Sequence, residues 1–362
     1  MRLSCIAILS LALSACVGAG GSAAPTTTPT LVPTPLFREP SQVPPLTLRE
    51  IFAPRDLSGL RLDPSRLRTI IATGDVMPGR GVDSIIRSQG DNFLYPIAAT
   101  RALTADADVA VINLEAPLVE GCPHTPGETF TFCGRPQTTA MLLAAGVDVV
   151  TIENNHIGNY GPQGVIETVA HLEAAGLAWA DRDTPALLDV RGLTFGFLAF
   201  NAVGETIDRE AMTERIRVLR PQVDVLAVAY HWGAEYVSVP QTAPGVANDD
   251  PVEIAHLAVD AGADLVIGNH PHWVQAVELY NGKFIAYSHG NFIFDQMWSY
   301  ETRVGVIGRY IFYDEALVGV EFTPVLIENF AQPVPLSGEE AQAVLTGMQA
   351  ASEELAGQLS GR

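Results

Sequence analysis

The stretch "ADLVIGNHPH" (263–272) contains the pattern on which the fold prediction depends. Its first half is apolar apart from one aspartate, which is typical of a buried strand. Two histidines, His270 and His272, then lie one residue apart. A chain with only 8 histidines has little reason to place two of them at the end of a buried strand for packing alone. The stretch therefore indicates a strand that ends in a polar, chemically active loop.

Four further apolar runs end in the same way, and helix-like segments separate them. The runs are "TIIATGDV" (69–76), "DVAVINLE" (108–115), "VDVVTIENNH" (147–156) and "DVLAVAYHWG" (224–233), and the helix-like segments are 97–104, 138–145, 164–175, 209–220 and 251–261. Strands that alternate with helices predict an α/β fold built from crossover units. Turns at 191–192 and 281–282 add two antiparallel hairpins, and 337–358 reads as a C-terminal helix. We therefore expect a two-sheet sandwich flanked by helices.

The polar residues at these strand ends are of the types that bind metals. Ligands of open α/β sheets bind outside the carboxyl ends of the strands. A single strand-end aspartate is usually a cap, and a lone histidine is usually an ordinary interior or surface group. Together the five ends would bury carboxylates and imidazoles at one edge, which is costly without a cation. We expect one or two Mn, Zn or Fe ions there, bound by Asp75, Glu115, Asn155, His231, His270 and His272.

Composition restricts the partners. The chain has 362 residues, of which 48% are hydrophobic and 17% charged, so most of it is expected to fold. The formal net charge of −20 would repel nucleic-acid phosphates, so we expect no nucleic-acid partner. A polyanionic substrate would need a cation or an arginine cluster to offset the same repulsion.

The N-terminus has the features of an export signal. Arg2 precedes a short apolar stretch, and small residues lead to Cys16, which resembles the lipobox of bacterial lipoproteins. We predict a lipoprotein signal over 1–16, lipidation of Cys16, a disordered Pro/Thr-rich tether over 17–60, and an extracytoplasmic, membrane-anchored protein. The alternative is an ordinary secretory signal with an incidental cysteine.

Two cysteines remain outside the signal. Cys122 and Cys133 are expected to form a disulfide, because an exported chain meets oxidising conditions. The weaker alternative is a zinc site that includes His124.

Six ordered motifs resemble the CapA family, the bacterial capsule and poly-γ-glutamate synthesis domain. They are "GDVMPGR", "NLEAPL", "NNHIGNYG", "YHWGAEY", "GNHPHWVQ" and "YSHGNFIFDQ", and the resemblance covers about 70–325. This family is similar in turn to calcineurin-like metallophosphoesterases. The resemblance implies a four-layer α/β/β/α sandwich over 68–330 with a metal site at the strand ends.

The resemblance also implies roles for individual residues. Asp75 and Glu115 would be the first and the bridging carboxylate ligands, Asn155 would bind a second metal, His231 would be the lone ligand of the fourth motif, and His270 and His272 would each reach a different metal. His156 would protonate a leaving group or steady the transition state. Two departures are clear: Met77 stands where a phosphoesterase has a histidine ligand, and Glu115 replaces a shorter aspartate.

Three more residues are predicted to belong to the same site. Arg80, in a Gly-rich loop, could hold a phosphate or carboxylate, although an ordinary surface arginine is the alternative. His289 and Asn291 follow an apolar run and are predicted to line the substrate pocket.

The sequence thus favours a surface-anchored, metal-dependent hydrolase or transferase with His156 as its acid/base. The resemblance implies a substrate that is an anionic cell-surface polymer such as poly-γ-glutamate, or a phosphoester. The rival hypothesis is a non-catalytic, polymer-binding subunit that works with a membrane synthase and holds a structural metal. A third hypothesis is an anchored protein whose motifs no longer bind metal or have a function.

Overall fold

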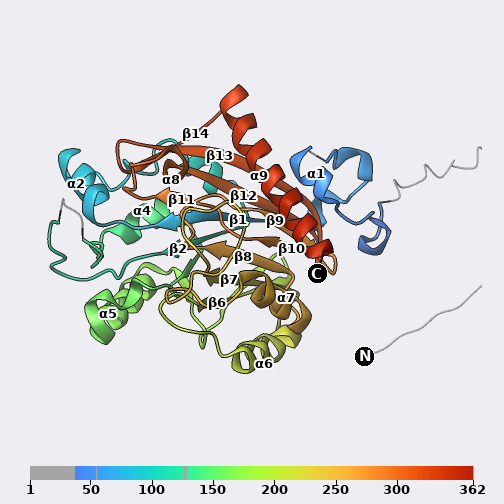
Figure 1. Cartoon of the computed structure of the whole chain (residues 1–362), viewed down its shortest axis with the longest axis horizontal. Helices are drawn as coiled ribbons and strands as arrows, with labels where there is room; N and C mark the ends of the chain where they lie inside the picture. The colour runs from blue at the N-terminus through green and yellow to red at the C-terminus, as the bar shows by residue number, and fades with distance from the viewer. Residues whose placement is uncertain (1–36, 54, 126–128, 362) are drawn as a thin grey trace, which may run out of the picture. The chain divides into compact units, whose positions relative to one another are not determined.

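Two β-sheets that pack face to face form the centre of the fold (Figure 1). The structure is a computed structural model that describes residues 37–53, 55–125 and 129–361. The first sheet contains, in spatial order, β14 (Gln332–Pro335), β13 (Ala316–Glu328), β12 (Val304–Tyr313), β1 (Leu67–Val76), β2 (Val109–Leu114), β3 (Val149–Thr151) and β4 (Ala178–Ala180), with β11 (Asn291–Ile293) paired to β1. The second contains β5 (Ala186–Val190), β6 (Leu193–Asn201), β7 (Val225–His231), β8 (Leu265–Asn269), β10 (Lys283–Ala286) and β9 (Val277–Tyr280).

Both sheets mix parallel and antiparallel pairs. Strands β1 to β4 run parallel in the first sheet, and β6, β7, β8 and β10 run parallel in the second. The predicted hairpins are the antiparallel pairs β5–β6 and β9–β10. The five predicted apolar runs correspond to β1, β2, β3, β7 and β8, so their carboxyl ends supply the loops that carry the predicted ligands.

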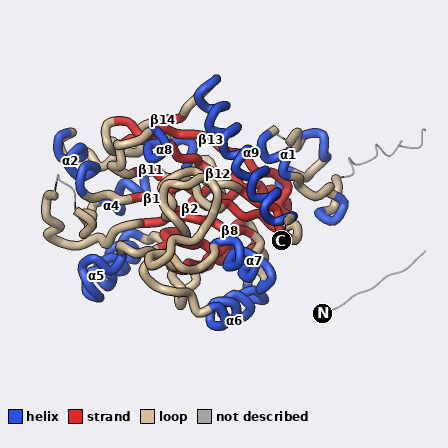
Figure 2. The backbone as a smooth tube through the Cα atoms, in the orientation of Figure 1, coloured by secondary structure: helices blue, strands red, loops and turns tan. Residues whose placement is uncertain are grey.

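Helices lie around the two sheets (Figure 2). They are α1 (Leu48–Phe52), α2 (Arg80–Ser88), α3 (Arg101–Thr104), α4 (Thr138–Ala144), α5 (Gly161–Ala175), α6 (Arg209–Leu219), α7 (Pro251–Ala261), α8 (Tyr300–Arg303) and α9 (Gly338–Ser360). Of these, α2, α4 and α5 cover the outer face of one sheet, while α6 and α7 cover that of the other. Among the described residues, none of these helices has both the length and the apolar character needed to cross a membrane.

Three apolar clusters separate the layers. One lies between the sheets and includes Ile70 of β1 and Phe195 of β6. A second packs α6 and α7 against β6, β7 and β8, and a third packs α2, α4 and α5 against β1, β2 and β3. The order of layers is therefore helix, sheet, sheet, helix, which confirms the predicted four-layer α/β/β/α sandwich.

A glycine lets the chain approach β1 beside the predicted site. A Cβ atom at Gly74 would come within 2.1 Å of the Gly290 carbonyl oxygen, a separation that no side chain could tolerate. The backbone N–H of Asp75 donates to that same carbonyl at 3.0 Å. Gly74 therefore brings the loop before β11, and Asn291 at its end, next to Asp75.

Two predicted boundaries are wrong. The expected helix 97–104 is helical only over α3, because Ala98 and Thr100 donate to carbonyls three residues back, as in a turn. The expected tether 17–60 is an ordered part of the domain from Phe37 onward, apart from residue 54, which is not described. Ile51 of α1 is buried in the cluster between the sheets, which the Pro-rich composition did not indicate. The rest of the predicted tether, the signal and Cys16 lie outside the described residues.

Candidate metal centre

The ends of β1, β2, β3, β7 and β8 bring all six predicted ligands together. Asp75, Glu115, His231, His270 and His272 are buried, and Asn155 is half-buried. Asp75 is the penultimate residue of β1 and His231 the last of β7, and the other four lie in the loops that follow β2, β3 and β8. The carboxyl ends of parallel strands from two packed sheets thus meet at one edge of the sandwich, as the topology requires.

Several donor atoms lie at spacings that suit a shared ion. His231 Nε2 lies 2.9 Å from Asn155 Oδ1 and 3.7 Å from Glu115 Oε1. His272 Nε2 lies 4.0 Å from Glu115 Oε1. Two donors that are each about 2.1 Å from one ion can be no more than about 4.2 Å apart. These spacings are therefore within the range for common ligation.

Glu115 and His270 present buried polar atoms that lack hydrogen-bond partners among the described residues. Both carboxylate oxygens of Glu115 and both ring nitrogens of His270 are in this condition, although Glu115 is 0% and His270 1% exposed. A buried carboxylate with no hydrogen bond is costly, and a cation offsets that cost. This donor set therefore fits a divalent metal.

The electrostatics of the cluster are those of a site that holds a cation. Burial, followed by repulsion from Asp75 and Glu235, raises the pKa of Glu115 well above its usual range. Burial raises the pKa of Asp75 to about 7, although hydrogen bonds from Asn113 and from the His270 N–H oppose the shift. Burial also lowers the pKa of His270, and lowers that of His272 to about 3. The imidazoles are therefore neutral at pH 7, with lone pairs free for a metal.

Asparagine side chains orient these ligands. Asn113 Nδ2 donates to Asp75 Oδ1 at 2.7 Å, and Asn154 Nδ2 donates to Asn113 Oδ1 at 3.1 Å. Asn291 Nδ2 donates to Gln296 Oε1 and to the Thr302 carbonyl, so its Oδ1 is the acceptor for His272 Nδ1 at 2.9 Å. That hydrogen bond leaves the His272 Nε2 lone pair facing the cluster.

Asn291 therefore has a different place from the one predicted. It is fully buried, and its side-chain hydrogen bonds all go to protein groups, so it supports a ligand from behind rather than lining a pocket. His289 is also a correction, because its ring contacts Tyr310 Oη at 2.7 Å and packs near Phe322 in the core. The sequence pattern could not separate a ring that points to the cluster from one that points between the sheets.

His156 lies at the edge of the cluster with one ring nitrogen held. Its Nδ1 is 3.0 Å from Asn159 Oδ1, which also accepts from the backbone N–H of Phe132. Its Nε2 is 4.0 Å from Glu115 Oε1, and its ring stacks on Phe132 with centroids 3.9 Å apart. Burial lowers the pKa of His156, so its Nε2 is a free base at neutral pH.

Arg80 is buried rather than a surface residue, and it is already paired. Its guanidinium forms two hydrogen bonds with Asp295, donates to the Thr129 carbonyl at 3.0 Å and lies over the Phe132 ring. Arg80 has a φ of 45°, an uncommon value for a residue with a side chain. Its predicted contact with a substrate anion stays a prediction, because Asp295 occupies its forked face.

The cysteine pair forms a disulfide. Cys122 and Cys133 are bonded, with Cα atoms 5.9 Å apart. The disulfide uses both sulfurs, which a zinc site with His124 would need, and the His124 ring lies 3.0 Å from Ser84 Oγ. The disulfide closes the loop that presents Phe132 to His156.

Sequence reasoning missed two residues of the site. Glu235 lies four residues after His231, and one of its oxygens lies within 4.8 Å of ring nitrogens of His270 and His272. Asp295 pairs with Arg80 from 215 residues away. Glu235 stands inside the quoted motif "YHWGAEY" and could have been noticed there, whereas no local signal identifies Asp295.

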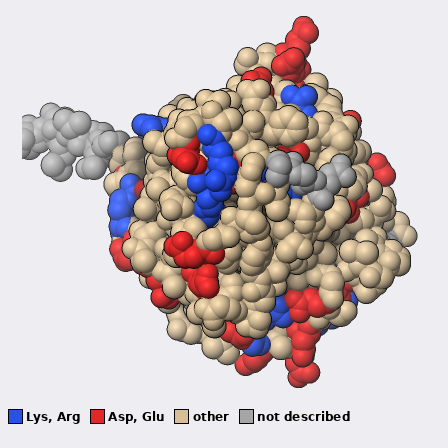
Figure 3. Space-filling model, turned by 90° about the vertical axis from the view of Figure 1, so that its left-hand side faces the viewer, with Lys and Arg blue, Asp and Glu red and all other residues tan. Residues whose placement is uncertain are grey.

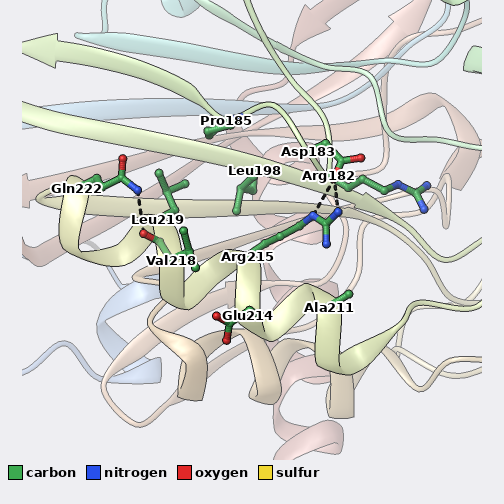
Figure 4. Close-up of a pocket in the computed structure, with 10 residues that line it drawn as sticks. All are labelled: Arg182, Asp183, Pro185, Leu198, Ala211, Glu214, Arg215, Val218, Leu219 and Gln222. Carbon is green, nitrogen blue, oxygen red and sulfur yellow. Dashed lines mark hydrogen bonds and ion pairs between the residues drawn. The ribbon is translucent and has the colours of Figure 1, made fainter.

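A cavity of ≈ 500 Å³ adjoins the cluster through Asn154 and Asn155. Arg182, between Glu153 and Glu205, lies on its wall. A smaller cavity of ≈ 270 Å³ lies against α6, where Arg215 pairs with Asp183, and it contains none of the predicted ligands (Figure 4). On the side of the fold that carries α2 and α5, acidic and basic side chains lie next to one another in several places, and most of that side carries neither (Figure 3).

Comparisons with known proteins agree with the resemblance to the capsule synthesis family. The family described as "Bacterial capsule synthesis protein PGA_cap" matches residues 69–296. "PGA biosynthesis protein CapA" of Bacillus subtilis is 27% identical over 285 residues, 73% of this chain and 72% of that protein. A "Probable polyglutamine synthesis accessory protein" of Mycobacterium tuberculosis is 27% identical over 289 residues, 63% of this chain and 74% of that protein. A crystal structure of a hypothetical protein from Thermus thermophilus gives a TM-score of 0.46 at 14% identity, covering 71% of this chain and 98% of that one.

Proposed function

Because the chain belongs to the bacterial capsule synthesis protein family PGA_cap, we propose that it is a metal-dependent hydrolase or transferase. Its substrate would be an anionic cell-surface polymer, poly-γ-glutamate or a related capsule polymer, or else a phosphoester. The observation that carries the proposal is the buried pair Glu115 and His270, whose polar atoms lack hydrogen-bond partners among the described residues. A purely structural core would not leave such groups unpaired.

The donor set would divide between two ions, each held in part by Glu115. Asp75, Glu115 and His272 would hold one ion, because they form one buried group of potential ligands in which His272 Nε2 lies 4.0 Å from Glu115 Oε1. Asn155, His231 and His270 would hold the other, again with Glu115. When bound, Mn, Zn or Fe would lower the pKa of water and polarise a carbonyl or phosphoryl oxygen.

His156 would act as the general acid/base. Asn159 fixes its Nδ1–H, which leaves Nε2 facing the cluster. A neutral imidazole at pH 7 can take a proton from the attacking group and return it to the leaving group. The stacked Phe132 ring would hold the imidazole plane during this transfer.

An anionic substrate is consistent with a metal centre despite the acidic chain. The net charge of −20 repels polyanions. Asp75, Glu115 and Glu235 contribute three negative charges when ionised, and two divalent cations would make the local charge positive. The metals would thus create the attraction that the surface lacks.

Metal analysis of the purified protein in chelator-free buffer tests the proposal first. We expect one or two equivalents of Mn, Zn or Fe, which are lost in His270→Ala/His272→Ala. The same preparations would then be assayed on γ-glutamyl amides and phosphoesters, with His156→Ala as the variant that keeps metal but loses turnover. A parent protein that takes up no metal even after reloading would overturn the proposal.

A non-catalytic role is the second candidate, and Met77 favours it. Met77 stands where a phosphoesterase ligand is expected, so one ion would be bound more weakly. In that case the protein would bind polymer for membrane synthase subunits around a structural metal. Bound metal together with unaltered polymer in every assay, for both the parent and His156→Ala, would favour this candidate.

We also propose that the mature chain is anchored outside the cytoplasm through lipidated Cys16. Support comes from the small residues that precede this cysteine in the sequence. Cys16→Ala should move the protein from the membrane fraction to the soluble one, and an unchanged distribution would contradict the anchor.

A further inference from the structure

Backbone hydrogen bonds fix Glu235 opposite the histidine turn. The N–H of Trp232 donates to the Asn269 carbonyl at 3.1 Å, and the N–H of Tyr236 donates to the Pro271 carbonyl at 2.9 Å. Gly233, with a φ of 76°, makes the bend between them possible. The segment 232–236 therefore follows the turn 269–271, and Glu235 is carried by a built scaffold rather than by a free loop.

The Glu235 side chain reaches both histidines. Its Oε1 lies 3.9 Å from His270 Nε2 and 4.0 Å from His272 Nε2. Both distances are within the limit of about 4.2 Å for two donors on one ion. His270 is 1% exposed, and neither of its ring nitrogens has a hydrogen-bond partner among the described residues. A buried, unpartnered imidazole thus lies beside this carboxylate.

Met77 does not supply a donor of its own. Its side chain is fully buried in a small apolar cluster with Phe132 and Phe294. Its sulfur accepts from the Gly79 N–H at 3.2 Å, so the thioether is already engaged. Asp75, Glu115 and His272 then give three protein donors to the ion on that side.

We propose that Glu235 is a metal ligand of this centre and adds a donor to a set in which Met77 supplies none, an inference that rests on the proposed function. Its carboxylate would bind metal beside His270 and His272, because the ligand atoms of these three residues all lie within 4.8 Å of one another. A carboxylate adds an oxygen donor to the imidazoles, and oxygen donors suit Mn²⁺.

Metal titration of Glu235→Gln tests the inference without relying on activity. The glutamine keeps the size of the side chain but removes its charge. Mn²⁺ alone would be the probe, with free Mn²⁺ followed by electron paramagnetic resonance and bound metal by elemental analysis. We expect at least about a tenfold weaker affinity at one of two Mn²⁺ positions, since even groups behind a ligand cost about 10–100-fold when lost.

Two further variants separate ligation from nearby charge. Glu321→Gln removes the same charge from an exposed residue of β13 and should leave both affinities unchanged. Glu235→His offers a different donor and should restore binding of Zn²⁺ rather than Mn²⁺. Equal Mn²⁺ affinities in the parent and in Glu235→Gln would overturn the role of Glu235 while leaving the proposed function intact. A parent that binds no metal would overturn both.

Discussion

At the scale of single residues, the centre depends on neutral side chains as much as on charged ones. Asn113 holds Asp75, and Asn291 holds His272, each through one amide. The direction of the Asn291 amide is set by the Thr302 carbonyl, which can only accept. A main-chain group of α8 thereby determines which nitrogen of His272 faces the cluster.

Asn291→Ala should therefore weaken metal binding although Asn291 is not a ligand. His272 would lose the acceptor that fixes its Nδ1–H, so we expect about a 10–100-fold lower metal affinity. Competition with a fluorescent chelator would measure it, beside Asn329→Ala, which changes an exposed residue whose amide donates to the Tyr95 hydroxyl. An affinity equal to that of the parent would show that His272 needs no support.

The buried carboxylates should also make the metal-free protein sensitive to pH. The pKa of Asp75 is about 7 in the folded state, against about 3.9 in an unfolded chain. Between these values the folded state binds more protons, so the free energy of unfolding falls as pH rises. Glu115, whose pKa is also raised well above its usual range, acts in the same direction.

The histidines act in the opposite direction at lower pH. The pKa of His272 falls to about 3, so the stability it contributes is present above about 6.5 and is lost as pH falls below that value. Above about 6.5 only the carboxylates matter. We expect the melting temperature in chelator to fall between pH 6.5 and 8.5, and Asp75→Asn to reduce that fall. A flat profile would mean that the carboxylates are not desolvated.

At the scale of elements, the loop closed by the disulfide carries a wall of the site. Cys133 follows Phe132, which stacks on His156 and lies under Arg80. Next to it, Gly134 bonds with Pro117 and Val119 of the segment after β2. The loop is thus attached at its C-terminal end by the backbone and across its base by the disulfide.

Cys122→Ser/Cys133→Ser should destabilise the fold by about 2–3 kcal/mol, the value for a closed loop of this length. The separation of 11 residues sets that figure. Metal affinity should change little, because no proposed ligand lies in the loop. Urea unfolding of the double variant and the oxidised parent would measure the difference. An unchanged midpoint would show that the backbone bonds alone hold the loop.

Periodicity predicted the parallel strands well because burial on both faces leaves a continuous apolar run. The same runs ended at Asp75, Glu115 and His231, so the cluster could be read from the chain. Glu235 was not predicted, because its place comes from the backbone pairing of segment 232–236 with another loop. His289 was misplaced because the direction of a side chain near a strand end depends on the packing of two sheets.

At the scale of the whole molecule, the domain begins earlier than composition suggests. Residues 37–53 and 55–60 contain α1 and pack on the sandwich, with the Tyr313 hydroxyl donating to the Arg38 carbonyl at 2.7 Å. Proline and threonine content predicted a tether there, since low hydrophobicity usually means no core. One buried isoleucine and three neighbours, Leu46, Leu48 and Phe52, are enough to dock the segment.

Ile51→Ala should therefore lower the stability of the entire domain. Removal of this buried side chain is expected to cost about 2–5 kcal/mol. Arg49→Ala lies on the same helix, is exposed, and should change the stability little. Thermal and urea unfolding would compare the two. Equal stabilities of Ile51→Ala and Arg49→Ala would show that the segment is a tether, as predicted, and does not pack on the domain.

The backbone at the histidine turn has a consequence for how such chains diverge. His270 and His272 both have positive φ, 93° and 56°, conformations that cost side-chain-bearing residues about 1–3 kcal/mol each. Only selection for the imidazoles would keep that cost over time. In lineages that abandon the metal, drift should replace these two histidines by glycine or asparagine before it touches the strands. The residues at positions 270 and 272 would then distinguish members of the family that bind metal from members that do not.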